Sequence, residues 1–146
     1  MNKPTYQIQF STNNRVFRFK SIGENGVIHK IVQFRKIKDN IYNLGFGDYD
    51  PITKIVDDEA RSNNGDLEKI LATIISIIAV FFDSYPDTII YFEGSSPSRI
   101  RLYQIVINLF HEELLNSYQI FGTVNEMIEP FKKNVNYESF YIKKMF

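Results

Sequence analysis

The stretch from Asp66 to Ser84 reads DLEKILATIISIIAVFFDS and contains the longest apolar run of the chain. Apolar residues recur through it at the three- and four-residue spacing of an α-helix. Ile77, Ala79 and Val80 lie off the main apolar face, so the middle of this helix is apolar nearly all round. Such a helix is buried on more than one side. We therefore expect a helix over residues 67–84, covered either within the monomer or at a dimer interface.

Asp66 stands directly before this helix, and Pro86 stands just after it. Asp is a favoured N-cap residue because its carboxylate can accept hydrogen bonds from the N–H groups of the first turn. Proline cannot continue a helix. The two residues therefore predict the ends of the helix.

Upstream of the helix, four short segments have the alternation and composition of β-strands. They cover residues 6–10, 16–20, 27–36 and 41–47. Turn-forming residues separate them, among them Asn25-Gly26, a pair that favours a tight hairpin. We expect these segments to form a four-stranded antiparallel meander.

Downstream, residues 88–92 form a short apolar segment, and Pro97 with its neighbouring serines gives a strong helix-start signal. The second helix is expected over residues 98–115, followed by strands at 118–124 and 140–144. The predicted fold is therefore α+β: an antiparallel sheet packed by two long helices, with further strands after them. We expect a single domain that covers residues 1–146, because 146 residues are the usual size of one domain.

The composition excludes several classes of function. Seventeen basic and seventeen acidic residues cancel, which argues against coating nucleic acid by charge alone, although a local basic patch is compatible with that balance. The absence of cysteine excludes disulfides, thiolate metal sites and cysteine nucleophiles. The apolar run over residues 74–82 is far shorter than the ~20 residues that cross a membrane. We expect a cytoplasmic protein with no membrane contact.

The first candidate site is the turn GSSPSRIRLY, residues 94–103, at the start of the second helix. Free backbone N–H groups and the helix dipole favour an anion at such a turn. This is not a P-loop, because the glycine spacing and the Gly-Lys-Ser/Thr ending are missing. The alternative is a well-capped helix whose arginines form salt bridges. The candidate anion-binding residues are Ser95, Ser96, Ser98, Arg99, Arg101 and Tyr103.

The second candidate site is the polar segment over residues 48–66, whose cluster comprises Asp48, Asp50, Asn63, Asn64 and Asp66. Clustered carboxylates can bind Mg²⁺ or Ca²⁺. However, Ile52 and Thr53 stand where an EF-hand loop needs an oxygen ligand and a glycine. The alternative is a solvated loop with Asx turns. We expect no metal and no other cofactor.

Other patterns are less specific. His29 and His111 have no spacing typical of a catalytic pair, and no nucleophile elbow is present. Lys30, Arg35, Lys36 and Lys38 form a modest basic stripe, which a charged sheet edge explains as well as a nucleic-acid contact does. A sheet with exposed Tyr or Phe could stack bases, but the alternation does not identify which face is exposed.

The chain resembles an uncharacterised family of small bacterial proteins known only as a domain of unknown function. The resembling stretches are YNLGFGDYD at residues 42–50, SNNGD at 62–66 and GSSPSRIRLY at 94–103. Residues 129–131 and 136–140 also fit. The resemblance covers nearly the whole chain and implies a single domain, but it implies no activity.

These observations leave three functional hypotheses. The first is a non-enzymatic binding protein that recognises a phosphate-bearing ligand or nucleic acid near Arg99 and Arg101. The second is a small metal-dependent nuclease, or a hydrolase of a toxin module, that uses the carboxylates of residues 48–66. The third is a structural protein that forms a homodimer through its apolar first helix. No pattern in the sequence decides whether the protein is an enzyme.

Overall fold

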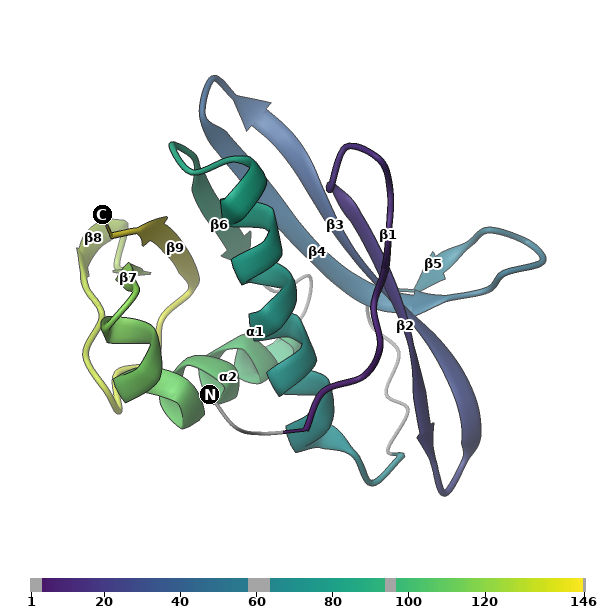
Figure 1. Cartoon of the computed structure of the whole chain (residues 1–146). Helices are drawn as coiled ribbons and strands as arrows, with labels where there is room; N and C mark the ends of the chain where they lie inside the picture. The colour runs from purple at the N-terminus through teal and green to yellow at the C-terminus, as the bar shows by residue number, and fades with distance from the viewer. Residues whose placement is uncertain (1–3, 58–63, 94–96, 146) are drawn as a thin grey trace. The chain divides into compact units, whose positions relative to one another are not determined.

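A computed structural model describes residues 4–57, 64–93 and 97–145 (Figure 1). The side chains of Ser98, Arg99 and Leu109 are not among those described. The chain divides into two compact units. The first unit comprises Met1–Arg35 and Leu44–Tyr85, and the second comprises Lys36–Asn43 and Pro86–Phe146.

The strands that lie wholly or mainly in the first unit form an antiparallel meander. In chain order they are β1 (Gln9–Phe10), β2 (Val16–Gly23), β3 (Gly26–Lys38) and β4 (Ile41–Tyr49), with the short β5 (Val56–Asp57) paired to the end of β4. The end of β3 and the start of β4 belong to the second unit. The β2–β3 hairpin turns at residues 24–25, where Gly23 pairs with Gly26. Gly26 has a φ of +86°, a conformation that glycine adopts without strain. The Asn-Gly signal therefore predicted this hairpin correctly.

One face of this meander packs against helix α1 (Leu67–Ser84). The ring of Phe34 on β3 stacks on that of Phe81, with centroids 4.0 Å apart. Closer to the start of the helix, the Tyr6 N–H donates to Thr73 Oγ1 at 2.9 Å. Most apolar residues of α1 between Ile70 and Phe82 are buried, and they lie on several sides of the helix, as expected. We call the sheet face toward α1 the inner face and the opposite one the outer face.

The second unit contains β6 (Ile89–Glu93), α2 (Pro97–Leu115), β7 (Tyr118–Val124), β8 (Met127–Pro130) and β9 (Ser139–Lys144). Its strands lie in the order β6-β9-β7-β8, and the first residues of β4 pair with β6. α2 covers one face, where Tyr103 packs edge-to-face on Phe92 with centroids 4.9 Å apart. The helix is kinked at Phe110, whose φ and ψ are −109° and 16°.

The mixed α+β class and the initial meander are confirmed, and α1 has the predicted bounds. Three features differ from the expectation. The first strand is only two residues long, β8 was not predicted, and β4 pairs with β6 in parallel. In the part of the chain that the structure describes, neither helix has the length and apolar character that crossing a membrane requires.

Candidate functional site

The predicted anion site at the start of α2 is described only in part. Ser95 and Ser96, and the side chains of Ser98 and Arg99, lie outside the described part of the chain. Arg101 is exposed within the first turns of α2, whose first turn carries no acidic residue. Tyr103 is buried and faces the core of the second unit through Phe92. Of the predicted set, Arg101 is thus the described side chain that is open to a ligand.

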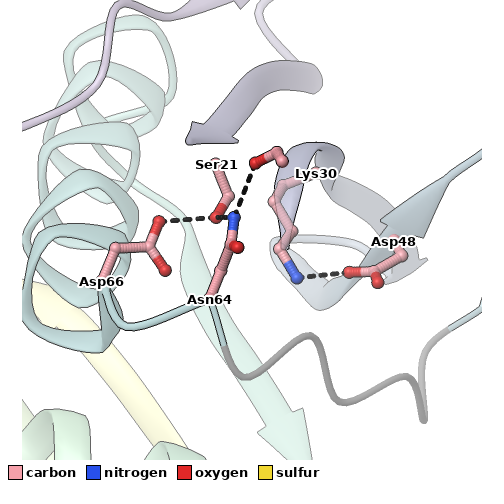
Figure 2. A network of polar contacts seen from close by, with 6 residues as sticks. Ser21, Lys30, Asp48, Asn64 and Asp66 are labelled. Carbon is pink, nitrogen blue, oxygen red and sulfur yellow. Dashed lines mark hydrogen bonds and ion pairs between the residues drawn. The ribbon is translucent and has the colours of Figure 1, made fainter. Parts of the chain in front are cut away.

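Asp48, the first member of the predicted polar cluster, forms an ion pair with Lys30 (Figure 2). Lys30 is buried on the inner face of β3, and its ammonium also lies 5.7 Å from the ring centre of Phe46. A buried ammonium needs a counter-charge, because its desolvation is otherwise very costly. The Asp48 carboxylate is therefore occupied with neutralising Lys30.

Asp50 caps the turn that follows β4. Its carboxylate accepts hydrogen bonds from the N–H groups of Ile52, at 2.8 Å, and Thr53, at 3.2 Å. These two bonds favour the ionised form and lower the pKa of Asp50. The arrangement is an Asx turn, the structural alternative considered for this segment.

Asn64 is buried and ties the chain before α1 to the β2–β3 hairpin (Figure 2). Its side-chain oxygen accepts from the Asn25 N–H at 2.6 Å, and its amide donates to Ser21 Oγ and the Gly26 carbonyl at 3.0 Å each. A Cβ on Gly23 would lie 1.9 Å from the Asn64 carbonyl oxygen, so only glycine leaves room for this approach.

Asp66 occupies the position before α1, but its side chain does not cap the helix. Its carboxylate instead accepts hydrogen bonds from Tyr6 and from Ser21, each at 2.5 Å. Burial and the bond to Asp66 raise the pKa of Tyr6. The expectation of a carboxylate cap was thus wrong, because two hydroxyl donors from other segments reach the carboxylate.

The described members of the polar cluster therefore do not form one site: Asp50 caps its own turn, and the other three divide into two groups (Figure 2). Asn64 and Asp66 meet at Ser21, whereas Asp48 meets Lys30. Asn63 lies outside the described residues. Within the described ranges, no group of three or more His, Asp or Glu side chains is placed to hold a metal ion.

The outer face of the first unit's sheet carries a different set of side chains. Strand register places Arg18 beside Ile31 and Lys20 beside His29 on this face. Arg35 follows on the same side of β3, because strand side chains alternate. The two carboxylates of these strands, Asp48 and Asp57, are register partners on the other face. In the described strands β1 to β5, the outer face thus holds three fixed cations and no acid.

Two cations lie close to the ring of Tyr49 at the edge of this face. The Arg18 guanidinium lies 4.6 Å from the centre of that ring, and the Lys54 ammonium lies 5.9 Å from it. Both distances are within the range of cation–π attraction. The three residues come from β2, β4 and the β4–β5 turn, so the sheet brings together charges that are far apart in sequence.

The sequence pattern of β2 indicates this face more clearly than the basic stripe on β3 does. Arg18 and Lys20 alternate with the buried Phe17 and Phe19, which predicts that the cations share the opposite face. Lys30, counted in the stripe, belongs instead to the buried inner side. The stripe is therefore corrected: its four residues all lie in β3, where Arg35 joins the outer face and Lys30 does not.

The chain belongs to a family described as a "Family of unknown function (DUF6934)", whose model matches residues 2–145. This membership agrees with the resemblance noted from the sequence. No curated protein and no solved structure matches the chain. The family thus brings no activity, and a functional proposal rests on the surfaces described above.

Proposed function

We propose that this protein is a non-enzymatic binding protein that recognises a phosphate-bearing ligand, with nucleic acid as the principal candidate. The observation that carries the proposal is the outer face of the first unit, where Arg18, Lys20 and Arg35 lie on one side of the sheet and the strand carboxylates Asp48 and Asp57 lie on the other. Lys and Arg that neutralise phosphates account for most sequence-independent affinity for nucleic acid.

The Arg18–Tyr49–Lys54 cluster supports this proposal because it holds cations in place before a ligand arrives. Fixing long basic side chains costs conformational entropy when a complex forms. An aromatic ring that already restrains Arg18 lowers that cost. Arginine also matches phosphate geometry with two parallel N–H donors, which a lysine cannot do.

The start of α2 is the second contact that we propose. Arg101 is exposed there, and the first turn of the helix carries no carboxylate to compete for it. Arg99 and the serines Ser95, Ser96 and Ser98 stay part of this candidate site on sequence grounds. The helix dipole would add a favourable field for a phosphate at this end.

The proposal is tested by fluorescence anisotropy with labelled single-stranded DNA, single-stranded RNA and duplex DNA. We expect the double variant R18A/K20A to bind each probe more weakly, because two phosphate contacts are removed. K132A/K133A is the matched control, since it also removes two charges from exposed residues outside the outer face. Equal affinities for the wild type and R18A/K20A would refute the outer face as the binding surface.

Arg101→Ala is measured with the same probes. A loss of affinity without a change in melting temperature supports the anion site at α2, whereas a loss of stability without a loss of affinity identifies a structural arginine. Incubation of the probes with the protein and Mg²⁺, followed by a denaturing gel, checks the nuclease alternative. We expect the probes to stay intact; metal-dependent cleavage would contradict a non-enzymatic role.

A further inference from the structure

The sheet of the second unit has an aromatic row on the face away from α2. Tyr91 on β6, Tyr141 on β9 and Phe121 on β7 are direct register partners across three neighbouring strands. All three side chains are partly exposed. Their neighbours along the strands, which include Ile90 and Phe140, are buried on the α2 side. The row is therefore not part of the core that α2 covers.

The rings in this row are held in place. The centroids of Tyr91 and Tyr141 lie 4.9 Å apart with their planes tilted by 49°. The Tyr91 hydroxyl donates to the Glu93 carboxylate at 2.6 Å, which fixes that ring further. Two aromatic neighbours on adjacent strands thus present π surfaces at a spacing set by the sheet.

The flanks of the row are polar or charged. On one side, Lys143 is the register partner of both Ile89 and Gln119 and is exposed. On the other side, Ser139 is the partner of Glu93 and Thr123. A ligand that lies flat on the rings would meet the Lys143 ammonium at one edge and the exposed Glu93 carboxylate at the other, while Ser139 is buried.

We propose that Tyr91, Tyr141 and Phe121 form a stacking platform for the unpaired bases of single-stranded nucleic acid. This inference rests on the proposed function and names its ligand class. Bases stack on aromatic side chains irrespective of sequence, because every base has a π face. The bases must be unpaired, since in a duplex they are stacked within the helix and cannot reach a flat surface. Lys143 supplies a cation for the adjacent backbone, which a neutral polysaccharide would not require.

The test compares three probes of matched length: an oligothymidylate of about 12 nucleotides, its abasic counterpart and inorganic polyphosphate. We expect Tyr141→Leu and Phe121→Leu each to weaken oligothymidylate binding by about five-fold or more, the effect of losing one stacked base. Binding of the abasic oligomer and of polyphosphate should be unchanged. Tyr141→Phe, which keeps the ring, should bind like the wild type, as should Met127→Ala, which shortens an exposed apolar side chain off the row.

Failure of this inference and failure of the proposed function give different results. If R18A/K20A weakens oligothymidylate binding and the two leucine variants do not, the outer face binds nucleic acid and the stacking platform is refuted. If the wild type binds none of the three probes, the proposed function itself fails. If a chito- or cello-oligosaccharide binds in a Tyr141-dependent manner and the oligonucleotides do not, the row serves a sugar and the inference is overturned.

A leucine variant could lose affinity because it unfolds, so a measurement on the wild type accompanies it. A 5-bromouridine oligonucleotide is cross-linked to the unmodified protein with ultraviolet light, and the linked peptides are identified by mass spectrometry. We expect cross-links at Tyr91, Tyr141 or Phe121. Cross-links confined to other residues would overturn the assignment.

Discussion

At the scale of single residues, the buried polar groups of the first unit are best explained as structural. Asn64 is only 3% exposed, yet each polar atom of its side chain has a backbone or hydroxyl partner in the β2–β3 hairpin. Asp66 is similarly satisfied by Tyr6 and Ser21. A fully satisfied network of this kind fixes one conformation and leaves little capacity for a ligand.

We therefore predict that Asn64→Ala lowers the free energy of unfolding by about 1–3 kcal/mol, because the buried partners of the amide lose their hydrogen bonds. Urea titration measures this change. Asn116→Ala, at an exposed position, should stay near the wild type. A binding role for Asn64 would be indicated instead if the variant kept its stability and lost affinity for nucleic acid.

The raised pKa of Tyr91 predicts that the free energy of unfolding depends on pH in the alkaline range. Burial, together with the hydrogen bond to Glu93, raises the pKa of Tyr91 from 10.0 to about 12. Between these values the unfolded chain loses the phenolic proton while the folded chain keeps it, so stability falls as the pH rises through this window. The contribution is fully present below pH 10.0, where both states are protonated.

Tyr91→Phe should consequently flatten the decline in unfolding free energy across that pH window, measured by urea titration at several alkaline pH values. The ring is retained, so we expect nucleic-acid binding near neutral pH to be unchanged. A variant with the same alkaline slope as the wild type would show that Tyr91 titrates normally in the folded protein.

At the scale of elements, the sequence pattern predicted those features that residues close together in the chain determine. The bounds of α1 agreed because its apolar spacing is regular and proline follows it. β8 was missed because its hairpin turns at Asn125-Glu126, both with positive φ, where the typical signal would be Asn-Gly. The parallel pairing of β4 with β6 depends on contacts across the chain, which no local pattern encodes.

For the candidate surfaces, too, the sequence predicted what neighbouring residues determine and not what depends on contacts across the chain. Alternation in β2 indicated which residues share a face, and the helix that covers the other face could not be assigned from the sequence. The Tyr91–Tyr141–Phe121 row requires the strand order β6-β9-β7, in which sequence neighbours are not spatial neighbours. Its members are consequently far apart in the chain and share no motif.

Two glycines in strands give an element-scale prediction. A Cβ on Gly122 of β7 would lie 2.2 Å from the ring of Tyr137, whereas one on Gly45 of β4 would meet nothing closer than 4.0 Å. Gly122→Ala should therefore destabilise the second unit by about 1–3 kcal/mol through overpacking. Gly45→Ala is the matched control and should change stability little. Equal melting temperatures for the two variants would show that Tyr137 moves aside without cost.

At the scale of the whole molecule, a net charge of zero hides a separation of charges. In the first unit, the carboxylates of the strands are on the inner side and the cations Arg18, Lys20 and Arg35 are on the outer side. A neutral chain can therefore present a local positive field. The charge balance excludes uniform coating of nucleic acid, but it does not oppose binding through one face.

This separation predicts a moderate dependence of binding on salt. If the three outer-face cations each neutralise one phosphate of a single strand, the slope of log affinity against log salt should be about −2. Raising the salt from about 50 mM to about 200 mM should then weaken binding about 20-fold. Anisotropy titrations of oligothymidylate over this range measure the slope.

Variants test whether the outer-face cations cause this dependence of affinity on salt. R18A/K20A should reduce the magnitude of the slope by about 0.7 for each cation removed, which leaves a slope of about −0.7. Tyr141→Leu should lower affinity and leave the slope unchanged, because stacking releases no counterions. The two effects would thus separate the electrostatic contribution of the first unit from the stacking contribution of the second. A wild-type slope near zero would contradict a phosphate ligand on the outer face, since binding that neutralises phosphates must release ions.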